Sequence, residues 1–133
     1  MISSAEEFKG LRESENPQNY QRASQEEASL EVWQEVLISF PEMAFWVAQN
    51  KTVPLEILEQ LSKNTDTTVR AMVARKRKLT QHIFNLLKDD PDESVRHALL
   101  WNTALSIHQK QSINTADSLW LKNELEKQID REN

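Results

Sequence analysis

Histidine is the first residue type in this 133-residue sequence that could support chemistry. His82 and His108 lie 26 positions apart, and imidazole side chains can bind a metal ion or transfer protons. Neither histidine belongs to an HExxH or HxH motif, and neighbouring packed helices lie about 10 Å apart, too far for two side chains to share a metal without further ligands. The sequence has no cysteine that could supply a thiolate. We therefore expect no metal site and no cofactor.

Motifs for other kinds of catalysis are also missing from the sequence. Serine, histidine and aspartate occur, but nothing places them as a triad. The chain has a single glycine, Gly10, so it has no glycine-rich loop to hold a phosphate group. The acidic pairs Glu26–Glu27 and Asp89–Asp90 fall at expected helix ends, where capping accounts for them. We predict that the protein is not an enzyme.

Two arginines, Arg70 and Arg96, are also 26 positions apart, and each follows an aspartate by four residues, Asp66 and Asp92 respectively. That spacing lets an aspartate and an arginine meet on one helical face or connect neighbouring helix pairs in a structural ladder. The alternative is a pair of arginines that binds an anionic ligand. We favour the ladder.

The basic run Arg75–Lys78 (RKRK) is expected at a turn between helices. Cations are favoured near helix C-termini, so a solvated loop is the simpler interpretation. A contact with phosphate or with an acidic partner is the alternative.

One helix face predicts a binding surface. If Val69 and Val73 point inward, then residues 68, 71 and 75 and their equivalents face the other way, because a helix turns about 100° per residue. Exposed aromatic residues and arginine are typical of the residues that dominate binding at protein interfaces. The alternative is that the tryptophans are buried against the ends of the molecule; Trp33 and Trp46 are expected in the core. The predicted protein-binding residues are Phe45, Gln49, Arg75, His97, Trp101 and Trp120.

The elements that would carry these residues repeat along the chain. Apolar and charged positions recur every 26 residues, and recurrence in this range is typical of repeat proteins. Three units in phase (53–78, 79–104 and 105–130) and a diverged unit (about 29–52) each show two short amphipathic helices. Residues 1–28 are predicted to form a helical cap on the repeat domain 29–133, the whole making one compact domain. The matching positions include Val69, Val95 and Leu121; Arg70, Arg96 and Lys122; and Val73, Leu99 and Leu125.

Helix ends are also expected at specific residues. Asn50 and Asn102 follow second helices, and asparagine tolerates the left-handed conformation that ends many helices. Asp90 before Pro91 is a plausible N-cap for the following helix.

Composition sets the class of the protein. One glycine, few prolines and many leucine, alanine, glutamate and lysine residues favour an all-α fold of about four stacked helix pairs. The acidic N-terminus lacks a signal-peptide pattern, and no apolar run approaches the ~20 residues that cross a bilayer. Together with the absence of cysteine, this predicts a soluble protein of the cytoplasm that does not enter membranes.

The segment 46–102, which reads WVAQNKTVPLEILEQLSKNTDTTVRAMVARKRKLTQHIFNLLKDDPDESVRHALLWN, resembles bacterial HEAT-like and leucine-rich-repeat-variant proteins. The similarity lies in VP-EIL--L, an acidic D-D segment and VR--VA-N, with Lys76 in place of the usual asparagine. Gln109 and Lys110 depart from apolar positions in the last unit. The resemblance implies a right-handed α-solenoid, a ladder role for the repeated arginines, and a surface that binds other molecules.

These observations predict a non-enzymatic protein-binding module. The net charge of −5 disfavours nucleic acid, because phosphate neutralisation supplies most of that affinity. Size, acidic ends and the aromatic surface suggest a bacterial immunity protein that neutralises a basic toxin domain. A nucleic-acid-binding HEAT-like protein and a structural adaptor in a larger complex are the alternatives.

Overall fold

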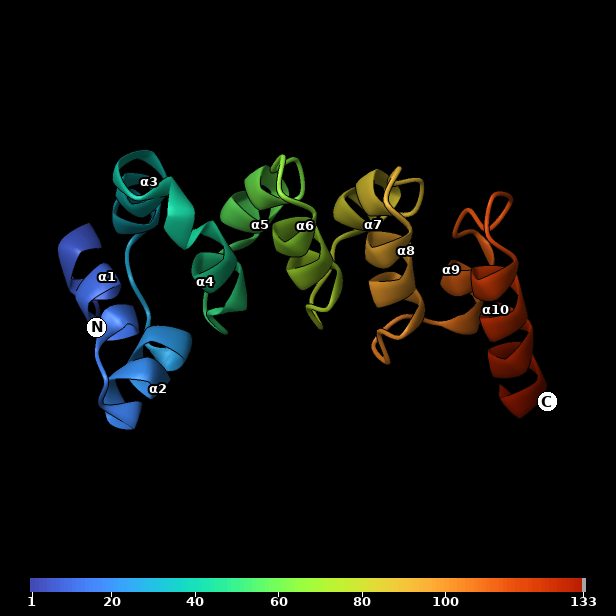
Figure 1. Ribbon diagram of the computed structural model, residues 1–133, viewed down its shortest axis with the longest axis horizontal. Coiled ribbons are helices and arrows are strands. Elements are labelled where there is room, and N and C mark those ends of the chain that lie inside the picture. The colour runs from blue at the N-terminus through green and yellow to red at the C-terminus, as the bar shows by residue number, and fades with distance from the viewer. Residues whose placement is uncertain (133) are drawn as a thin grey trace. The chain divides into compact units, whose positions relative to one another are not determined.

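The protein is all-helical in a computed structural model that describes residues 1–132 (Figure 1). Ten α-helices and one 3₁₀-helix cover this part of the chain, and it contains no strand beyond one isolated bridge between Ile2 and Ala28. The all-α prediction is therefore confirmed. The chain forms two compact units, unit 1 (Met1–Lys63) and unit 2 (Asn64–Asn133). The boundary at residue 28 and the 26-residue repeat stay predictions.

Unit 1 contains five α-helices around a core of aromatic and aliphatic side chains. Helix α1 packs on α2 and α3, and α3 and α4 pack on α5. Trp33 is fully buried and meets the edge of Phe8 at 5.2 Å, which confirms its predicted place in the core. The elements are α1 (Ala5–Glu13), α2 (Pro17–Gln25), α3 (Leu30–Ser39), the 3₁₀-helix η1 (Pro41–Met43), α4 (Ala44–Gln49) and α5 (Leu55–Leu61).

The expected burial of Trp46 is wrong. This side chain is only half-buried, and the guanidinium of Arg12 lies 3.4 Å from the centroid of its ring. A cation over an indole face replaces hydrophobic cover there, because the electron-rich ring attracts the positive charge.

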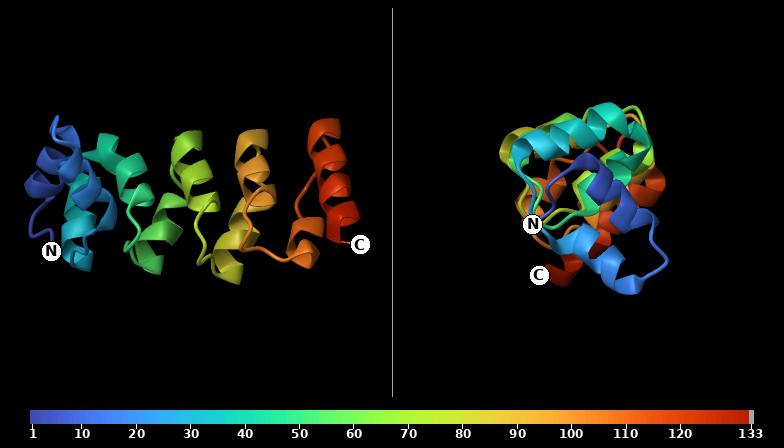
Figure 2. Two further views of the ribbon diagram at one scale, coloured as in Figure 1. Left: turned by 90° about the horizontal axis from the view of Figure 1, so that it is seen from below. Right: turned by 90° about the vertical axis from the view of Figure 1, so that its left-hand side faces the viewer.

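Unit 2 contains the other five α-helices, and α6, α8 and α10 lie side by side in it (Figure 2). Val69 and Val73 of α6 are buried, as predicted, and Leu121 of α10 is fully buried as well. The inward face of α6 is thereby fixed. On the opposite face Thr68 and Arg75 are exposed, as predicted, whereas Ala71 is buried. The elements are α6 (Thr67–Ala74), α7 (Gln81–Leu87), α8 (Glu93–Leu100), α9 (Ile107–Gln111) and α10 (Leu119–Glu132).

Two expectations about helix ends are wrong. No residue among 1–132 has a positive φ, so Asn50 and Asn102 do not adopt the left-handed conformation. Their side chains hold the turn instead. The Asn102 amide donates to the carbonyls of Ala74 (2.9 Å) and Lys76 (2.8 Å), and its oxygen accepts from the Ala104 N–H (2.9 Å).

The N-cap of α8 is Asp92 and not Asp90. The carboxylate of Asp92 accepts the Ser94 N–H at 2.8 Å, and Asp66 accepts the Thr68 N–H in the same way at the start of α6. These bonds satisfy N–H groups that have no partner inside the helix. The hydroxyls of Thr68 and Ser94 also donate to the two carboxylates, and these hydroxyl bonds, followed by the N–H bonds, lower the pKa of both aspartates. Asp90 is thereby left for another contact.

Lys110, which departs from the apolar pattern, is nevertheless buried where α9 packs against α10. Its ammonium donates to the side-chain oxygen of Gln128 at 2.9 Å. Burial lowers the pKa of Lys110, because the charged form is disfavoured away from water.

Among the helices within residues 1–132, none has the length and apolar character needed to cross a bilayer.

Candidate functional site

Arg70 is one of two largely buried arginines in unit 2 that are held by aspartates. It approaches Asp90 in a bidentate pair, with Nε to Oδ2 at 2.7 Å and Nη2 to Oδ1 at 3.2 Å. Its remaining nitrogen donates to the backbone carbonyl of Asn64 at 2.8 Å. The Asp90 side chain is buried, and this pairing raises the pKa of Arg70. The bonds tie the start of α8 to the segment before α6.

Arg96 is held in a similar way at the other side of α8. It donates to both carboxylate oxygens of Asp117, at 2.7 and 3.2 Å, and to the carbonyl of Asn114 at 2.7 Å. Those bonds lower the pKa of Asp117. The partners therefore differ from the predicted ones, because Asp66 and Asp92 are occupied as helix caps. Both buried arginines have a structural environment, and neither offers its guanidinium to a ligand.

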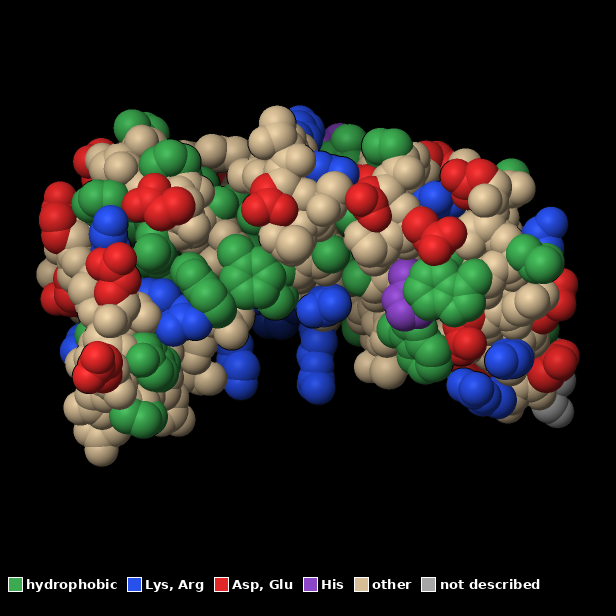
Figure 3. All heavy atoms as spheres, in the orientation of Figure 1, with side chains coloured by type: hydrophobic (Ala, Val, Ile, Leu, Met, Phe, Trp, Pro, Cys, Tyr) green, Lys and Arg blue, Asp and Glu red, His purple; other side chains and the backbone are tan. Residues whose placement is uncertain are grey.

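An aromatic cluster of His97, Trp101 and Trp120 lies on the surface of unit 2. The His97 ring stacks on Trp120 with centroids 4.2 Å apart and an interplanar angle of 18°. The Trp101 indole N–H donates to His97 Nε2 at 2.6 Å. Trp101 is 47% exposed and Trp120 is 52% exposed, so the alternative in which they are buried is wrong. Hydrophobic and histidine side chains gather over α8 and α10 in Figure 3.

The cluster favours the neutral form of His97. A nitrogen that accepts the indole proton cannot carry its own, so protonation at Nε2 breaks the bond to Trp101. Burial is the largest cause that lowers the pKa of His97, and the positive charge of Arg75 lowers it further. Glu124 and Glu93 act in the opposite direction without offsetting the burial.

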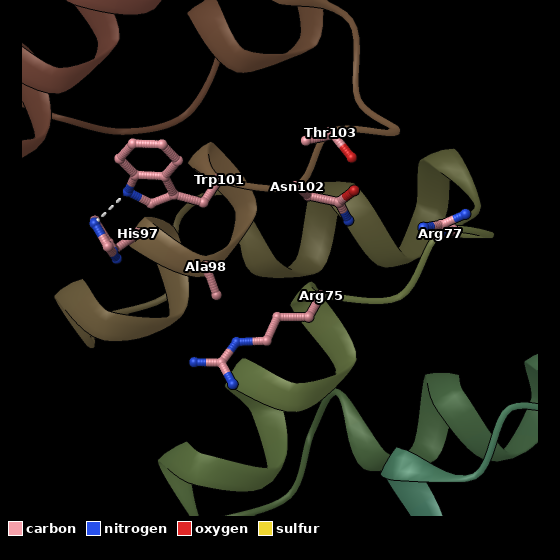
Figure 4. Close-up of a pocket in the computed structure, with 7 residues that line it drawn as sticks. All are labelled: Arg75, Arg77, His97, Ala98, Trp101, Asn102 and Thr103. Carbon is pink, nitrogen blue, oxygen red and sulfur yellow. Dashed lines mark hydrogen bonds between the residues drawn. The ribbon is translucent and has the colours of Figure 1, made fainter. Parts of the chain in front are cut away.

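A depression of about 470 Å³ adjoins the cluster, and we call it the arginine pocket. Arg75 is the C-cap residue of α6, and Arg77 follows in the next turn. Figure 4 shows the Arg75 side chain extending toward the side where His97 lies, with Arg77 at the other end. The pocket brings three predicted residues together, and its lining consists of Arg75, Arg77, His97, Ala98, Trp101, Asn102 and Thr103.

Two predicted residues belong to unit 1. Phe45 is half-buried and meets Trp46 edge to face at 4.7 Å. Gln49 lines a second depression of about 470 Å³ together with Arg12 and Tyr20. The predicted binding residues are thus divided, two in unit 1 and four in unit 2.

Sequence reasoning left out some residues that line the arginine pocket. Arg77 and Thr103 were not assigned to the binding surface, although Arg77 belongs to the basic run. The sequence signal that could have found them is Asn102, which directly follows α8. Its amide bonds to the Ala74 carbonyl and so brings this turn beside the end of α6.

The surface of unit 2 offers exposed aromatic rings and positive charge. His82 and His108 are exposed, and no three histidine, aspartate or glutamate side chains among residues 1–132 are grouped so that they could hold a metal ion. No protein-family model, no curated protein and no solved structure matches this chain at a significant level.

Proposed function

We propose that the protein is a non-enzymatic, cytoplasmic protein-binding module that holds its partner at the aromatic cluster and the arginine pocket. The observation that carries this proposal is the exposure of Trp101 and Trp120. Large aromatic side chains are costly to leave in water, and they are the residues that most often dominate protein interfaces. The stack through His97 holds Trp120 in a fixed orientation, which reduces the entropy lost when a partner binds.

In the same proposal, residues 29–133 form a HEAT-like right-handed α-solenoid of about four helix pairs, with residues 1–28 as its cap. Similar contacts at positions 26 residues apart support it. Asp66 and Asp92 cap α6 and α8, and Arg70 and Arg96 each bond an aspartate and a backbone carbonyl of a neighbouring segment. A solved structure of the full chain tests the repeat, since the helix pairs must then superimpose after a constant rotation and translation.

The test of the binding surface compares three forms of the full chain: the wild type, a double tryptophan variant and a control variant. Partners are captured from cells that express the protein naturally, identified by mass spectrometry and then purified for titration. Trp101→Ala with Trp120→Ala is expected to weaken binding by about 30-fold or more, as loss of dominant interface residues does. Ile38→Ala, which removes a still more exposed apolar side chain of unit 1, is the control. Equal affinity of all three forms contradicts the proposal.

An immunity protein against a basic toxin domain is the narrower form of the proposal. The charge of unit 1 favours it, with eleven acidic against five basic side chains in residues 1–63. Opposite charges speed association and exclude wrong partners. Recovery of a partner with nuclease or other toxin activity, whose activity the protein inhibits, supports this role. A partner with no toxic activity favours the structural adaptor.

Nucleic acid is the second candidate partner, because single strands bind to exposed aromatic rings beside arginines. A gel-shift titration of a single-stranded oligonucleotide at low and moderate salt separates the two classes. Phosphate contacts predict a steep loss of affinity with salt.

A further inference from the structure

Most of the side-chain hydrogen-bonding groups that remain free in the arginine pocket are donors. The amide of Asn102 is fully engaged with the carbonyls of Ala74 and Lys76 and with the Ala104 N–H. His97 Nε2 and the Trp101 indole N–H bond to each other. The side-chain polar groups that remain in the lining are two guanidinium groups, the Nδ1–H of the neutral His97 ring and the hydroxyl of Thr103.

The two guanidinium groups are not neutralised from within. Arg75 and Arg77 are exposed, no acidic residue lines the pocket, and neither side chain forms an ion pair within residues 1–132. Arg70 and Arg96 in the same unit are each held by a bidentate aspartate. The difference leaves the donors of Arg75 and Arg77 available for a ligand.

We propose that the arginine pocket binds the carboxylate of an acidic side chain on the protein partner, an inference that rests on the proposed function. A carboxylate accepts two parallel hydrogen bonds from a guanidinium, and such charge-assisted bonds are about twice as strong as neutral ones. The Trp101 ring and Ala98 supply an apolar wall for the methylene groups that precede the carboxylate. An amide, a cation or a hydroxyl cannot satisfy the same donors as well.

Charge complementarity favours a carboxylate as the ligand of the arginine pocket. Two residues of the basic run, Arg75 and Arg77, line the pocket, whereas the lining contains none of the acids of unit 2. The acidic net charge of the chain weakens long-range attraction of a polyanionic nucleic acid. A single carboxylate at short range is less affected by that repulsion, because salt screens charges more than about 10 Å away.

The experiment follows the side-chain Nε–H signals of the arginines by NMR in the full chain. The probes are capped tetraglutamate, capped tetraglutamine and a short oligothymidylate, each titrated to millimolar concentration. The glutamate peptide is expected to shift the signals of Arg75, Arg77 and the Trp101 indole, while the signals of Arg70 and Arg96 stay in place. The glutamine peptide is expected to shift none of them. No shift with glutamate, or tighter binding of the oligothymidylate at the same residues, overturns the inference.

Variants separate this inference from the proposed function. Arg75→Gln with Arg77→Gln is expected to lower the affinity for the glutamate peptide and for the purified protein partner by about tenfold or more. Lys78→Gln with Lys122→Gln removes the same charge from exposed residues outside the pocket and is expected to change affinity by less than about threefold. Unchanged Arg70 and Arg96 signals show that the variants are folded. If Trp101→Ala abolishes partner binding but the double arginine variant does not, the carboxylate site is wrong and the protein interface stands.

Discussion

Unit 2 contains arginines in two different environments: some are bonded to aspartates, and others are exposed in a pocket. Arg70 and Arg96 each bond a carboxylate and a backbone carbonyl, and within residues 1–132 only the Nε of Arg96 is left without a partner. Arg75 and Arg77 are instead exposed and line a pocket with Trp101 that contains no acid. Residue type alone therefore does not separate a structural arginine from one available for binding. A bidentate bond to an aspartate, present at Arg70 and Arg96, does separate them.

The comparison assigns different consequences to the loss of each group. Removing a buried partner leaves a charge with no solvent to stabilise it, and the cost appears in folding. Removing an exposed guanidinium changes folding little, and any cost appears in binding. The predictions below test this separation from the largest expected effect to the smallest.

Asp90→Ala is expected to destabilise the protein by about 3 kcal/mol or more, because it leaves the largely buried Arg70 without its carboxylate. The measurement is the free energy of unfolding in urea. Asp89→Ala, at the neighbouring exposed position, is expected to stay within about 0.5 kcal/mol of the wild type. Equal losses in the two variants would remove the distinction between the arginine settings.

Arg96→Met is expected to cost about 2 kcal/mol, since the apolar stem is retained while the bonds to Asp117 and to the Asn114 carbonyl are lost. Arg75→Met, the same exchange at an exposed residue, is expected to change stability by less than about 0.5 kcal/mol. Thermal unfolding of the two variants side by side provides the measurement. A larger loss for Arg75→Met would show that the pocket arginine has a structural role.

Asp66→Ala is expected to cost about 1 kcal/mol, the usual effect of losing an N-cap. Asp66→Asn keeps an oxygen that can accept the Thr68 N–H and is expected to be nearly neutral. Urea unfolding distinguishes this assignment from a role as ion-pair partner of Arg70, in which both variants would be destabilised to a similar extent.

The smallest expected effect is the pH response of the aromatic cluster. The pKa of His97 is lowered in the folded state, chiefly by burial, so the unfolded chain binds its proton first as the pH falls. The contribution to stability is present above the ordinary value of 6.5 and is lost as the pH drops through the lowered pKa. Tryptophan fluorescence is expected to change with the same midpoint, because protonation breaks the bond from Trp101.

His97→Gln should abolish this fluorescence transition, and His108→Gln, at an exposed position elsewhere in unit 2, should leave it intact. A transition that survives in His97→Gln would have to come from another group.

Sequence patterns predicted the features that depend on periodic burial. The scarcity of glycine predicted helices, and the phase set by Val69 and Val73 correctly placed Trp101 and Trp120 on the outside. Periodicity carries no information about which carboxylate a long side chain reaches. The pairing of Arg70 with Asp90 depends on the path of the turn before α8, and its assignment required coordinates.

The sequence pattern also failed to predict the backbone conformation at helix ends and the side chain that packs on Trp46. Asparagine at a helix end is compatible both with left-handed geometry and with a side-chain bond, and Asn102 uses the second. Arg12 covers Trp46 from another helix of unit 1, a contact that no regular spacing indicates.

The Asn102 amide gives the turn after α6 a further property. It fixes the carbonyls of Ala74 and Lys76, which flank Arg75, from the turn that follows α8. The main chain beneath the basic run is thus held at two carbonyls, while the side chains of Arg75 and Arg77 stay exposed. We therefore expect that substitutions at positions 75 and 77 can change the charge of this surface without disturbing the fold of the helices on either side.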